Sequence, residues 1–204
     1  MPHKNSYIKS YCHIEENTVS LNGKPIYENE DDDFSVFIKS AYNALEVDYP
    51  KFFKMDGLSK LAFLAADVLL KHEKTTPTKE ENIAIVLSNK ASSLDTDRRH
   101  QESIQDKDNF YPSPTIFVYT LPNICIGEIS IKYKMYSENS FFIFDTFNPD
   151  YLVDYCNSLL DENKADKVLC GWVDLDKEQY KAFLYIIDDK GSILHNTEEL
   201  KQLF

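Results

Sequence analysis

Residues 141–160 read FFIFDTFNPDYLVDYCNSLL, which is an apolar run, a short polar turn and a second apolar pattern. The run from Phe141 to Phe144 predicts a buried strand, because an unbroken apolar run suits a strand covered on both faces. Asn148-Pro149-Asp150 combines a helix N-cap, a first-turn proline and a first-turn acid, so a helix should begin there. The apolar positions that follow recur at helical spacing and predict the inner face of that helix: Leu152, Val153, Cys156, Leu159 and Leu160.

Buried helices and buried strands alternate on both sides of this stretch. Residues 58–70 are apolar almost all round, which predicts a buried helix, and Ile83 to Leu87 predicts a strand covered on both faces. Such alternation is typical of a layered α/β fold around a central sheet, and nothing in residues 1–204 marks a linker, so we expect one domain. The other expected elements are a strand hairpin at 6–22 with turns at 15–17 and 22–23, a helix at 34–45, two short helices within 115–136 separated by Pro122, strands at 167–173 and 182–187, a helix from about Asn196, and a surface helix or mobile loop at 95–108.

The composition excludes several classes of function. The chain has 204 residues and a formal charge of −12 from 34 acidic and 22 basic residues, and nucleic-acid phosphates repel such a chain. Its five glycines form neither a GxGxxG pattern nor a P-loop, which argues against a nucleotide-binding loop. No apolar run reaches the ~18–20 residues of a membrane span, and the start resembles no signal peptide. We therefore expect a cytoplasmic protein that contacts neither membranes nor nucleic acids.

Metal and cofactor sites have little support in the residue pattern. The acidic run from Glu28 to Asp33 lacks the ligand spacing of an EF-hand, so we expect a solvated loop. No histidine lies at metal-ligand spacing from another His or Cys, and we expect no cofactor. The cysteines are widely separated among apolar residues, which predicts reduced, buried thiols at Cys12, Cys125, Cys156 and Cys170.

Residues 111–123 read YPSPTIFVYTLPN and are followed by Gly127-Glu128-Ile129. This pattern resembles the segment ahead of the active site in β-ketoacyl synthases, namely the bacterial types of fatty-acid, polyketide and aryl-polyene pathways. Residues 165–174, ADKVLCGWVD, are similar to the family's A-D-x-V-L-x-G-x-x-D strand. The likeness runs in the same order over roughly residues 6–188 and includes Ser59-Lys60-Leu61-Ala62 with Ala65-Ala66, and Ile83 to Ser88. It implies the N-terminal half of a thiolase-like subunit, with a mixed central β-sheet covered by helices.

The same resemblance implies where a nucleophile should be. Family members carry a cysteine at the turn between a buried strand and a buried helix, and two histidines of the second half assist it. The matching turn here, residues 144–150, contains no cysteine, and its degenerate position lies near Asp145, Thr146 and Phe147. Asp145 and Asp150 would also place negative charge where a thiolate or an oxyanion develops. We therefore expect no condensing activity and no catalytic residue.

Three functions remain open from the sequence. The first is a non-catalytic partner subunit that forms a homodimer, or a heterodimer with a full-length ketosynthase, through the strand Phe141, Phe142, Ile143 and Phe144. The second is an acyl-transferring or condensing half-enzyme completed by a partner chain, with Thr146 and Cys156 as candidates. The third is a module that binds an acyl carrier protein through a basic patch at Arg98 and Arg99, to which Lys71, Lys74 and Lys79 could add.

Overall fold

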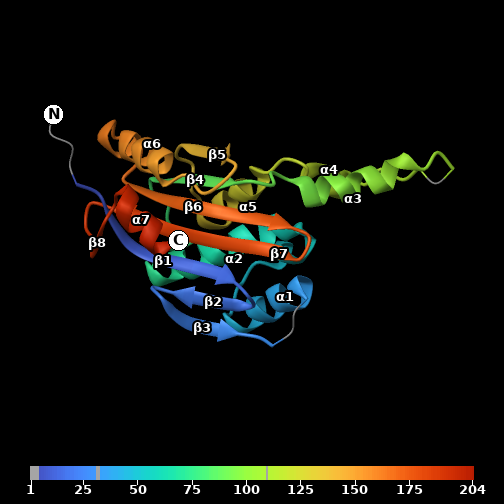
Figure 1. Cartoon of the computed structure of the whole chain (residues 1–204), viewed down its shortest axis with the longest axis horizontal. Helices are drawn as coiled ribbons and strands as arrows, with labels where there is room; N and C mark the ends of the chain where they lie inside the picture. Colours follow the sequence, from blue (N-terminus) through green and yellow to red (C-terminus); the bar gives the residue numbers. More distant parts are fainter. Residues whose placement is uncertain (1–4, 31–32, 109) are drawn as a thin grey trace.

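The computed structural model describes residues 5–30, 33–108 and 110–204. Their strands form one mixed, eight-stranded sheet (Figure 1). The order is β3-β2-β1-β7-β6-β4-β5, with β8 beside β1. β4 pairs in parallel with β5 and β6, and the other pairs are antiparallel. The strands are β1 (Tyr7–Glu15), β2 (Thr18–Leu21), β3 (Lys24–Glu28), β4 (Ile83–Asn89), β5 (Asn139–Ile143), β6 (Lys167–Asp176), β7 (Gln179–Asp188) and β8 (Ile193–Leu194).

The N-terminal strands follow from tight turns in the sequence. Glu16 and Asn17 adopt left-handed backbone conformations, with φ of 46° and 56°, and connect β1 to β2. Asn22 and Gly23 do the same between β2 and β3, with φ of 50° and 75°. Two consecutive residues with positive φ match the twist of a hairpin, so both predicted turns are confirmed.

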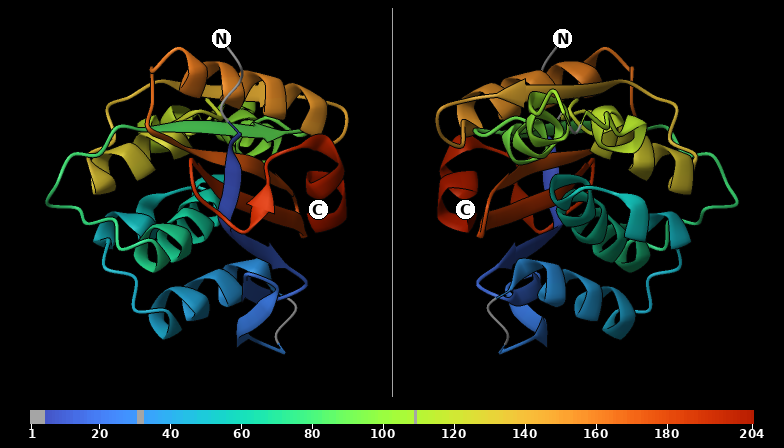
Figure 2. Two further views of the ribbon diagram at one scale, coloured as in Figure 1. Left: turned by 90° about the vertical axis from the view of Figure 1, so that its left-hand side faces the viewer. Right: turned by 90° about the vertical axis from the view of Figure 1, so that its right-hand side faces the viewer.

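Helices cover both faces of the sheet (Figure 2). On one face, α2 (Gly57–His72) packs against β1, β6 and β7, and α5 (Ile124–Tyr133) packs on α2. α1 (Phe34–Ala44) covers α2 near β3. On the other face, α6 (Pro149–Asp161) packs against β4 and β6, and α7 (Thr197–Leu203) packs on α6. Since α2 lies between the sheet and other helices, its apolar surface on nearly all sides is explained.

The predicted start of α6 is confirmed by its capping bond, and two further helices have caps that were not predicted. The Asn148 side chain accepts a hydrogen bond from the Tyr151 amide at 3.1 Å at the start of α6. Asp56 accepts one from the Ser59 amide at 2.9 Å at the start of α2. Asp33 caps α1 by accepting from the Val36 amide at 3.0 Å, whereas residues 31–32 of the acidic run lie outside the described residues. Each cap satisfies an amide that the helix itself leaves unpaired.

The segment after β4 projects from the body of the molecule. It contains α3 (Leu94–Gln105) and α4 (Pro114–Val118), which together we call the arm (Figure 1). Thus the polar segment predicted as a helix or a loop is helical as far as Gln105. A short 3₁₀ helix, η1 (Pro50–Lys54), precedes α2 and lies beside the base of the arm, where both line one hollow.

The prediction of a strand buried on both faces at Phe141–Phe144 is wrong. β5 is an edge strand that pairs only with β4 among the described strands. Phe141 and Phe142 are half-buried, and Ile143 is 55% exposed. In contrast, every residue of β4 is buried, because β4 has neighbours on both sides. An apolar run alone does not distinguish a central strand from an edge strand.

Candidate functional site

The turn that follows β5 borders an open hollow of about 600 Å³. β4 and β5 are parallel, so their carboxyl ends meet at one edge of the sheet, where α6 also begins. The predicted degenerate residues Asp145, Thr146 and Phe147 all line this hollow, together with Lys90 of the segment after β4 and Lys201 of α7. The structure thus brings the candidate residues of the turn together at one edge of the sheet.

The chemistry of this hollow does not supply an activated nucleophile. None of its described lining residues is a histidine or a cysteine, so the Thr146 hydroxyl has no imidazole base there. Asp145 and Asp150 are exposed carboxylates close to the start of α6, and Asp150 accepts a hydrogen bond from the Thr197 hydroxyl at 2.7 Å. These two carboxylates already interact with the positive end of the helix dipole, and their negative charge would repel an oxyanion that developed beside them.

The four cysteines lie in the core and not in the hollow. Cys156 projects from α6 into the core on that face of the sheet, where burial and the neighbouring Cys170 raise the pKa of its thiol. Burial likewise raises the pKa of Cys12 and of Cys125, whose Sγ lies 3.1 Å from the Pro122 carbonyl oxygen. A nucleophilic cysteine needs the opposite shift, towards the thiolate. The predicted inward orientation of Cys156 is therefore confirmed.

A buried serine–histidine pair escaped sequence analysis. The Ser6 hydroxyl donates a hydrogen bond to Asn157 Oδ1 at 2.7 Å and lies 3.3 Å from His195 Nδ1. Burial lowers the pKa of His195 to about 4, so its ring is neutral at pH 7. Because the hydroxyl proton is directed to the amide and the ring is a weak base, the cluster joins β1, α6 and the segment before α7 and does not activate Ser6. Nothing in the sequence relates Ser6 to His195.

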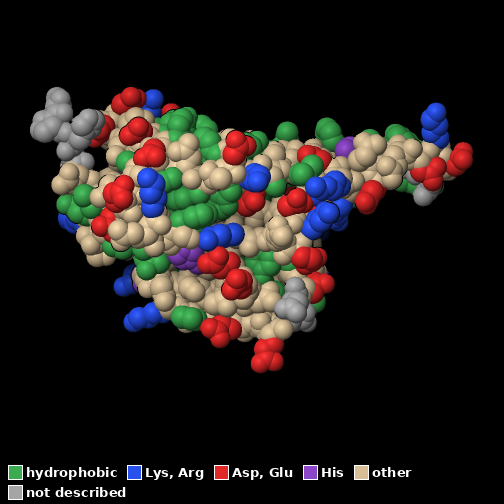
Figure 3. All heavy atoms as spheres, in the orientation of Figure 1, with side chains coloured by type: hydrophobic (Ala, Val, Ile, Leu, Met, Phe, Trp, Pro, Cys, Tyr) green, Lys and Arg blue, Asp and Glu red, His purple; other side chains and the backbone are tan. Residues whose placement is uncertain are grey.

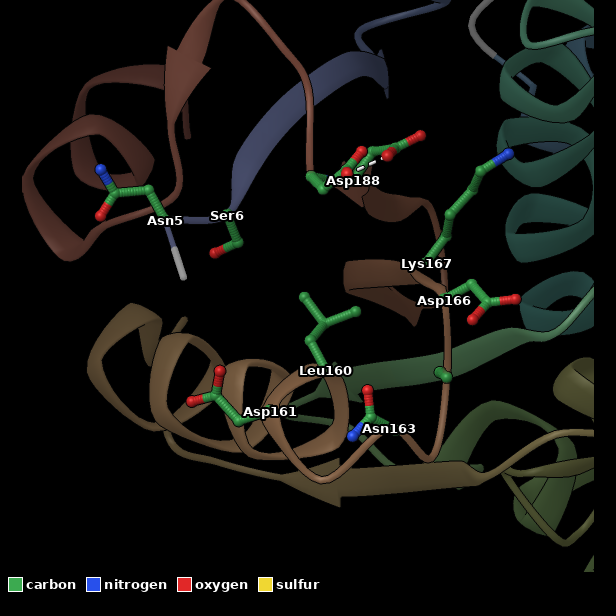
Figure 4. A pocket seen from close by; sticks show the side chains of 10 residues that line it. Asn5, Ser6, Leu160, Asp161, Asn163, Asp166, Lys167 and Asp188 are labelled. Atoms are coloured by element: carbon green, nitrogen blue, oxygen red, sulfur yellow. Dashed lines mark hydrogen bonds between the residues drawn. The ribbon is translucent and has the colours of Figure 1, made fainter. Parts of the chain in front are cut away.

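Ser6 also borders a hollow of about 320 Å³ between the start of β1 and the end of α6 (Figure 4). The carboxylates of Asp161, Asp166 and Asp188 also line this hollow, and Lys167 adds a cation. Nowhere in the described parts of the chain do three or more His, Cys, Asp or Glu side chains form a group that could hold a metal ion. Within the same ranges, no helix is long and apolar enough to cross a membrane.

The adjacent arginines of the predicted basic patch face different surroundings. Arg98 forms an ion pair with Asp176 at the end of β6, whereas Arg99 lines a hollow at the base of the arm. Lys60 of α2 lines the same hollow as Arg99. Lys71 lies about 16 Å further along α2 than Lys60, and Lys71 forms an ion pair with Asp67 at 2.8 Å. The structure therefore does not gather these cations into one surface patch.

The open edge of β5 is the other candidate feature. The Phe144 amide donates to the Asn89 carbonyl at 2.9 Å, and the Glu138 carbonyl accepts from the Ile85 amide at 3.1 Å. Since successive residues of a strand point their backbone groups to alternate sides, the groups that point away from β4 are those of three residues. These residues are Asn139, Phe141 and Ile143.

Aromatic side chains support β5 from the α6 face. The Phe142 ring lies 4.9 Å from that of Tyr151 and 5.0 Å from that of Tyr155. The Phe144 ring lies 5.2 Å from Tyr151, and Ser140 Oγ lies 2.7 Å from the Tyr155 hydroxyl. These contacts hold the strand in place against α6.

Comparison with protein-family models gave no match, and comparison with curated protein sequences gave none either. Solved structures do match. A chain of the ishigamide ketosynthase/chain length factor superposes with a TM-score of 0.63 and 13% identity over 90% of this chain and 62% of that chain. A chain of the ketosynthase ApeO in complex with its chain length factor ApeC, from Xenorhabdus doucetiae, gives 0.60 and 13% over 92% and 80%. A β-ketoacyl synthase from Burkholderia phymatum gives 0.59 and 10% over 98% and 60%.

This chain thus spans about three fifths of the length of the ishigamide and Burkholderia chains that it matches. Sequence identities of 10–13% speak for the fold and not for an activity. The expected α/β class, with a mixed sheet covered by helices, is confirmed both by the topology and by these superpositions. The chain has the thiolase-like fold shared by ketosynthases and chain length factors.

Proposed function

We propose that this chain is a non-catalytic, ketosynthase-like partner subunit that binds a ketosynthase through the open edge of β5. Two of the matched structures are described as a ketosynthase with a chain length factor, so pairing of two such folds has a precedent. The observation that carries the proposal is the outer edge of β5, which pairs with no other described strand and carries no charged side chain. Residues 1–204 act in it as one unit, in a pathway of the fatty-acid, polyketide or aryl-polyene type.

The two edges of the sheet differ in a way that supports this choice. The other edge, β3, reads KPIYE and carries Lys24, Pro25 and Glu28, which discourage the addition of another strand. β5 reads NSFFI and has neither a charge nor a proline. An exposed apolar edge without such protection favours aggregation unless another chain covers it.

An added strand has defined partners on β5. It would bond with the backbone groups of Asn139, Phe141 and Ile143, and it would bury the Ile143 side chain, which is 55% exposed. The same edge would serve a second copy of this chain or a ketosynthase. The superpositions on ketosynthase–chain length factor complexes favour the heterodimer.

The non-catalytic part of the proposal is supported by the chemistry of the turn. Thr146 has no histidine among the described residues around it, and the four thiols are buried. The alternative of an acyl-transferring half-enzyme requires a partner to supply a base to Thr146. Acylation is therefore the property to test in the complex as well as in the isolated chain.

The assembly is tested by co-expressing the chain with a full-length ketosynthase from the same organism and measuring the complex by light scattering. We expect a complex with the wild-type chain, and its loss with Ile143→Lys, which places a charge at the open edge. Ile26→Lys is the matched control, because Ile26 is an exposed isoleucine on the opposite edge strand, β3. A complex that tolerates Ile143→Lys, or a wild-type chain that stays monomeric and unbound, would show that β5 is not the interface.

The non-catalytic assignment is tested by intact mass after incubation with acyl thioesters. We expect no acyl adduct on this chain, alone or in the complex. An adduct that disappears with Thr146→Ala would instead identify the chain as a half-enzyme.

A further inference from the structure

Both basic and acidic side chains are seen where the arm joins the body of the molecule (Figure 3), and three cations of this region line one hollow. Lys54 of η1, Lys60 of α2 and Arg99 of α3 line a hollow of about 200 Å³. Thr115 of α4 lies on the same wall. Lys39 of α1 is close enough for its charge to act on Lys60. We call this set, without Lys39, the arm-base pocket.

The cations of the arm-base pocket have no carboxylate partner within ion-pair distance among the described residues. Some lysines elsewhere are held by carboxylates, as Lys9 is by Glu73 at 2.9 Å and Lys51 by Glu128 at 2.8 Å. Within the described residues, neither Lys54, Lys60 nor Arg99 forms an ion pair. In a chain with 34 acidic residues and a net charge of −12, three cations without an ion pair that line one hollow form a local positive site.

One carboxylate is found among the described residues of the pocket, and it is already used. Asp56 is 6% exposed, accepts from the Ser59 amide at 2.9 Å and accepts from the Thr96 hydroxyl at 2.7 Å. Burial raises the pKa of Asp56 and so disfavours its charge. Asp56 is therefore held by Ser59 and Thr96, and its charge offsets only part of the charge of the three cations.

The charged form of Lys60 is disfavoured in the pocket, and a bound anion would stabilise it. Burial, followed by the charges of Lys39 and Arg99, lowers the pKa of the Lys60 ammonium. A bound anion would reverse part of this shift, since opposite charge within a few ångströms favours the charged form. The Arg99 guanidinium adds a planar fork of donors that matches an oxyanion, and the exposed Thr115 hydroxyl is a further donor.

We propose that the arm-base pocket binds a phosphate-class oxyanion, either free or carried as a phosphomonoester. Three cations that line one hollow suit a doubly charged tetrahedral anion better than a single carboxylate, because two negative charges offset more of the positive charge. Phe53 and Ile116 provide an apolar wall next to the cations, which leaves room for the organic part of a phosphomonoester. This binding function goes beyond the pairing through β5 and involves none of the residues of that edge.

The experiment measures the melting temperature and the dissociation constant with inorganic phosphate, with sulfate and with glycerol 3-phosphate, at constant ionic strength set by chloride. We expect phosphate to raise the melting temperature of the wild-type chain more than chloride does. Arg99→Ala should weaken phosphate binding about tenfold or more, since it removes a charge-assisted pair. Arg98→Ala is the matched control, because the adjacent arginine is held by Asp176 and faces away from the pocket lining.

Lys60→Met should abolish the rise in melting temperature that phosphate causes. If the half-buried Lys60 position does not tolerate this change, Arg99→Ala still tests the pocket, because Arg99 is exposed and its replacement keeps the fold. Binding of glycerol 3-phosphate tighter than that of inorganic phosphate would support a carried phosphate, and equal binding would support the free anion. The proposal is overturned if phosphate acts no more strongly than chloride, or if Arg99→Ala and Arg98→Ala behave alike. Since the β5 interface is not involved, either result leaves the proposed pairing with a ketosynthase unaffected.

Discussion

Acid should destabilise this protein through His195, and the effect is large enough to measure. His195 is 4% exposed, and burial lowers the pKa of its ring from 6.5 to about 4. The folded protein therefore holds the ring neutral, whereas the unfolded chain takes up a proton near pH 6.5. Proton uptake by the unfolded chain lowers the free energy of unfolding as the pH falls. The stability is fully present above about pH 6.5 and is lost progressively as the pH falls towards 4.

The size of the effect follows from the shift in pKa. Each unit corresponds to about 1.4 kcal/mol, so the complete loss is about 3 kcal/mol, of which about 2 kcal/mol is already lost at pH 5. The assay is urea unfolding at pH 7, 6 and 5 on the wild-type chain and on His195→Gln. We expect the variant to be less stable at pH 7, because its bonds to Ser6 and Asn157 change, and yet to lose about 2 kcal/mol less between pH 7 and 5.

The comparison between the two proteins removes the contributions of other groups. Burial also lowers the pKa of His13 and raises that of Asp56, and both effects are common to the wild-type chain and the variant. His72→Gln, at an exposed histidine at the end of α2, is the matched control and should follow the wild type. If His195→Gln loses as much stability between pH 7 and 5 as the wild-type chain does, then burial of His195 is not the cause of the acid sensitivity.

Other consequences of the structure are open to direct measurement. Gly171→Ala should prevent folding or cost about 4 kcal/mol or more, because its Cβ would lie 2.0 Å from the Phe183 carbonyl oxygen, at a φ of 150°. Gly127→Ala, where an added Cβ meets nothing within 4 Å, should instead raise the melting temperature. Glu128→Ala should cost about 3 kcal/mol in urea unfolding, because it leaves the buried Tyr119 hydroxyl, the Tyr49 hydroxyl and the Lys51 ammonium without their acceptor. A maleimide at pH 7 should label no thiol in the folded chain and four in urea, read by intact mass; rapid labelling of the folded chain would contradict the burial of Cys12, Cys125, Cys156 and Cys170.

Much of the fold was accessible from local patterns. The cap at Asn148, the glycine turn at Gly23 and the all-round apolar helix α2 depend on residues close in sequence, and the sequence predicted all three. The resemblance of residues 111–129 to β-ketoacyl synthases pointed to the thiolase-like fold that the superpositions confirm. Such signals persist because capping, turn geometry and helical spacing act over a few residues.

The candidate site was only partly accessible in this way. The turn near Thr146 was found, because strand, turn and helix follow one another along the chain. The Ser6–His195 contact was not found, because it joins residues 189 positions apart. Arg98 and Arg99 were treated as one patch, whereas the turn of α3 directs one to Asp176 and the other to the arm-base pocket. Adjacent residues on a helix point about 100° apart, so only their surroundings decide what each one binds.

By itself the sequence determined most of the helices and strands, although not β3, β8 or η1, and it determined that the chain lacks a cysteine at the turn after β5. Only the tertiary structure decided that β4 is central and β5 is an open edge, although both are apolar runs. It also decided which cations are paired and which converge on a hollow. The physical reason is that local propensity depends on neighbours along the chain, whereas burial, strand order and charge compensation depend on segments that folding brings together from far apart.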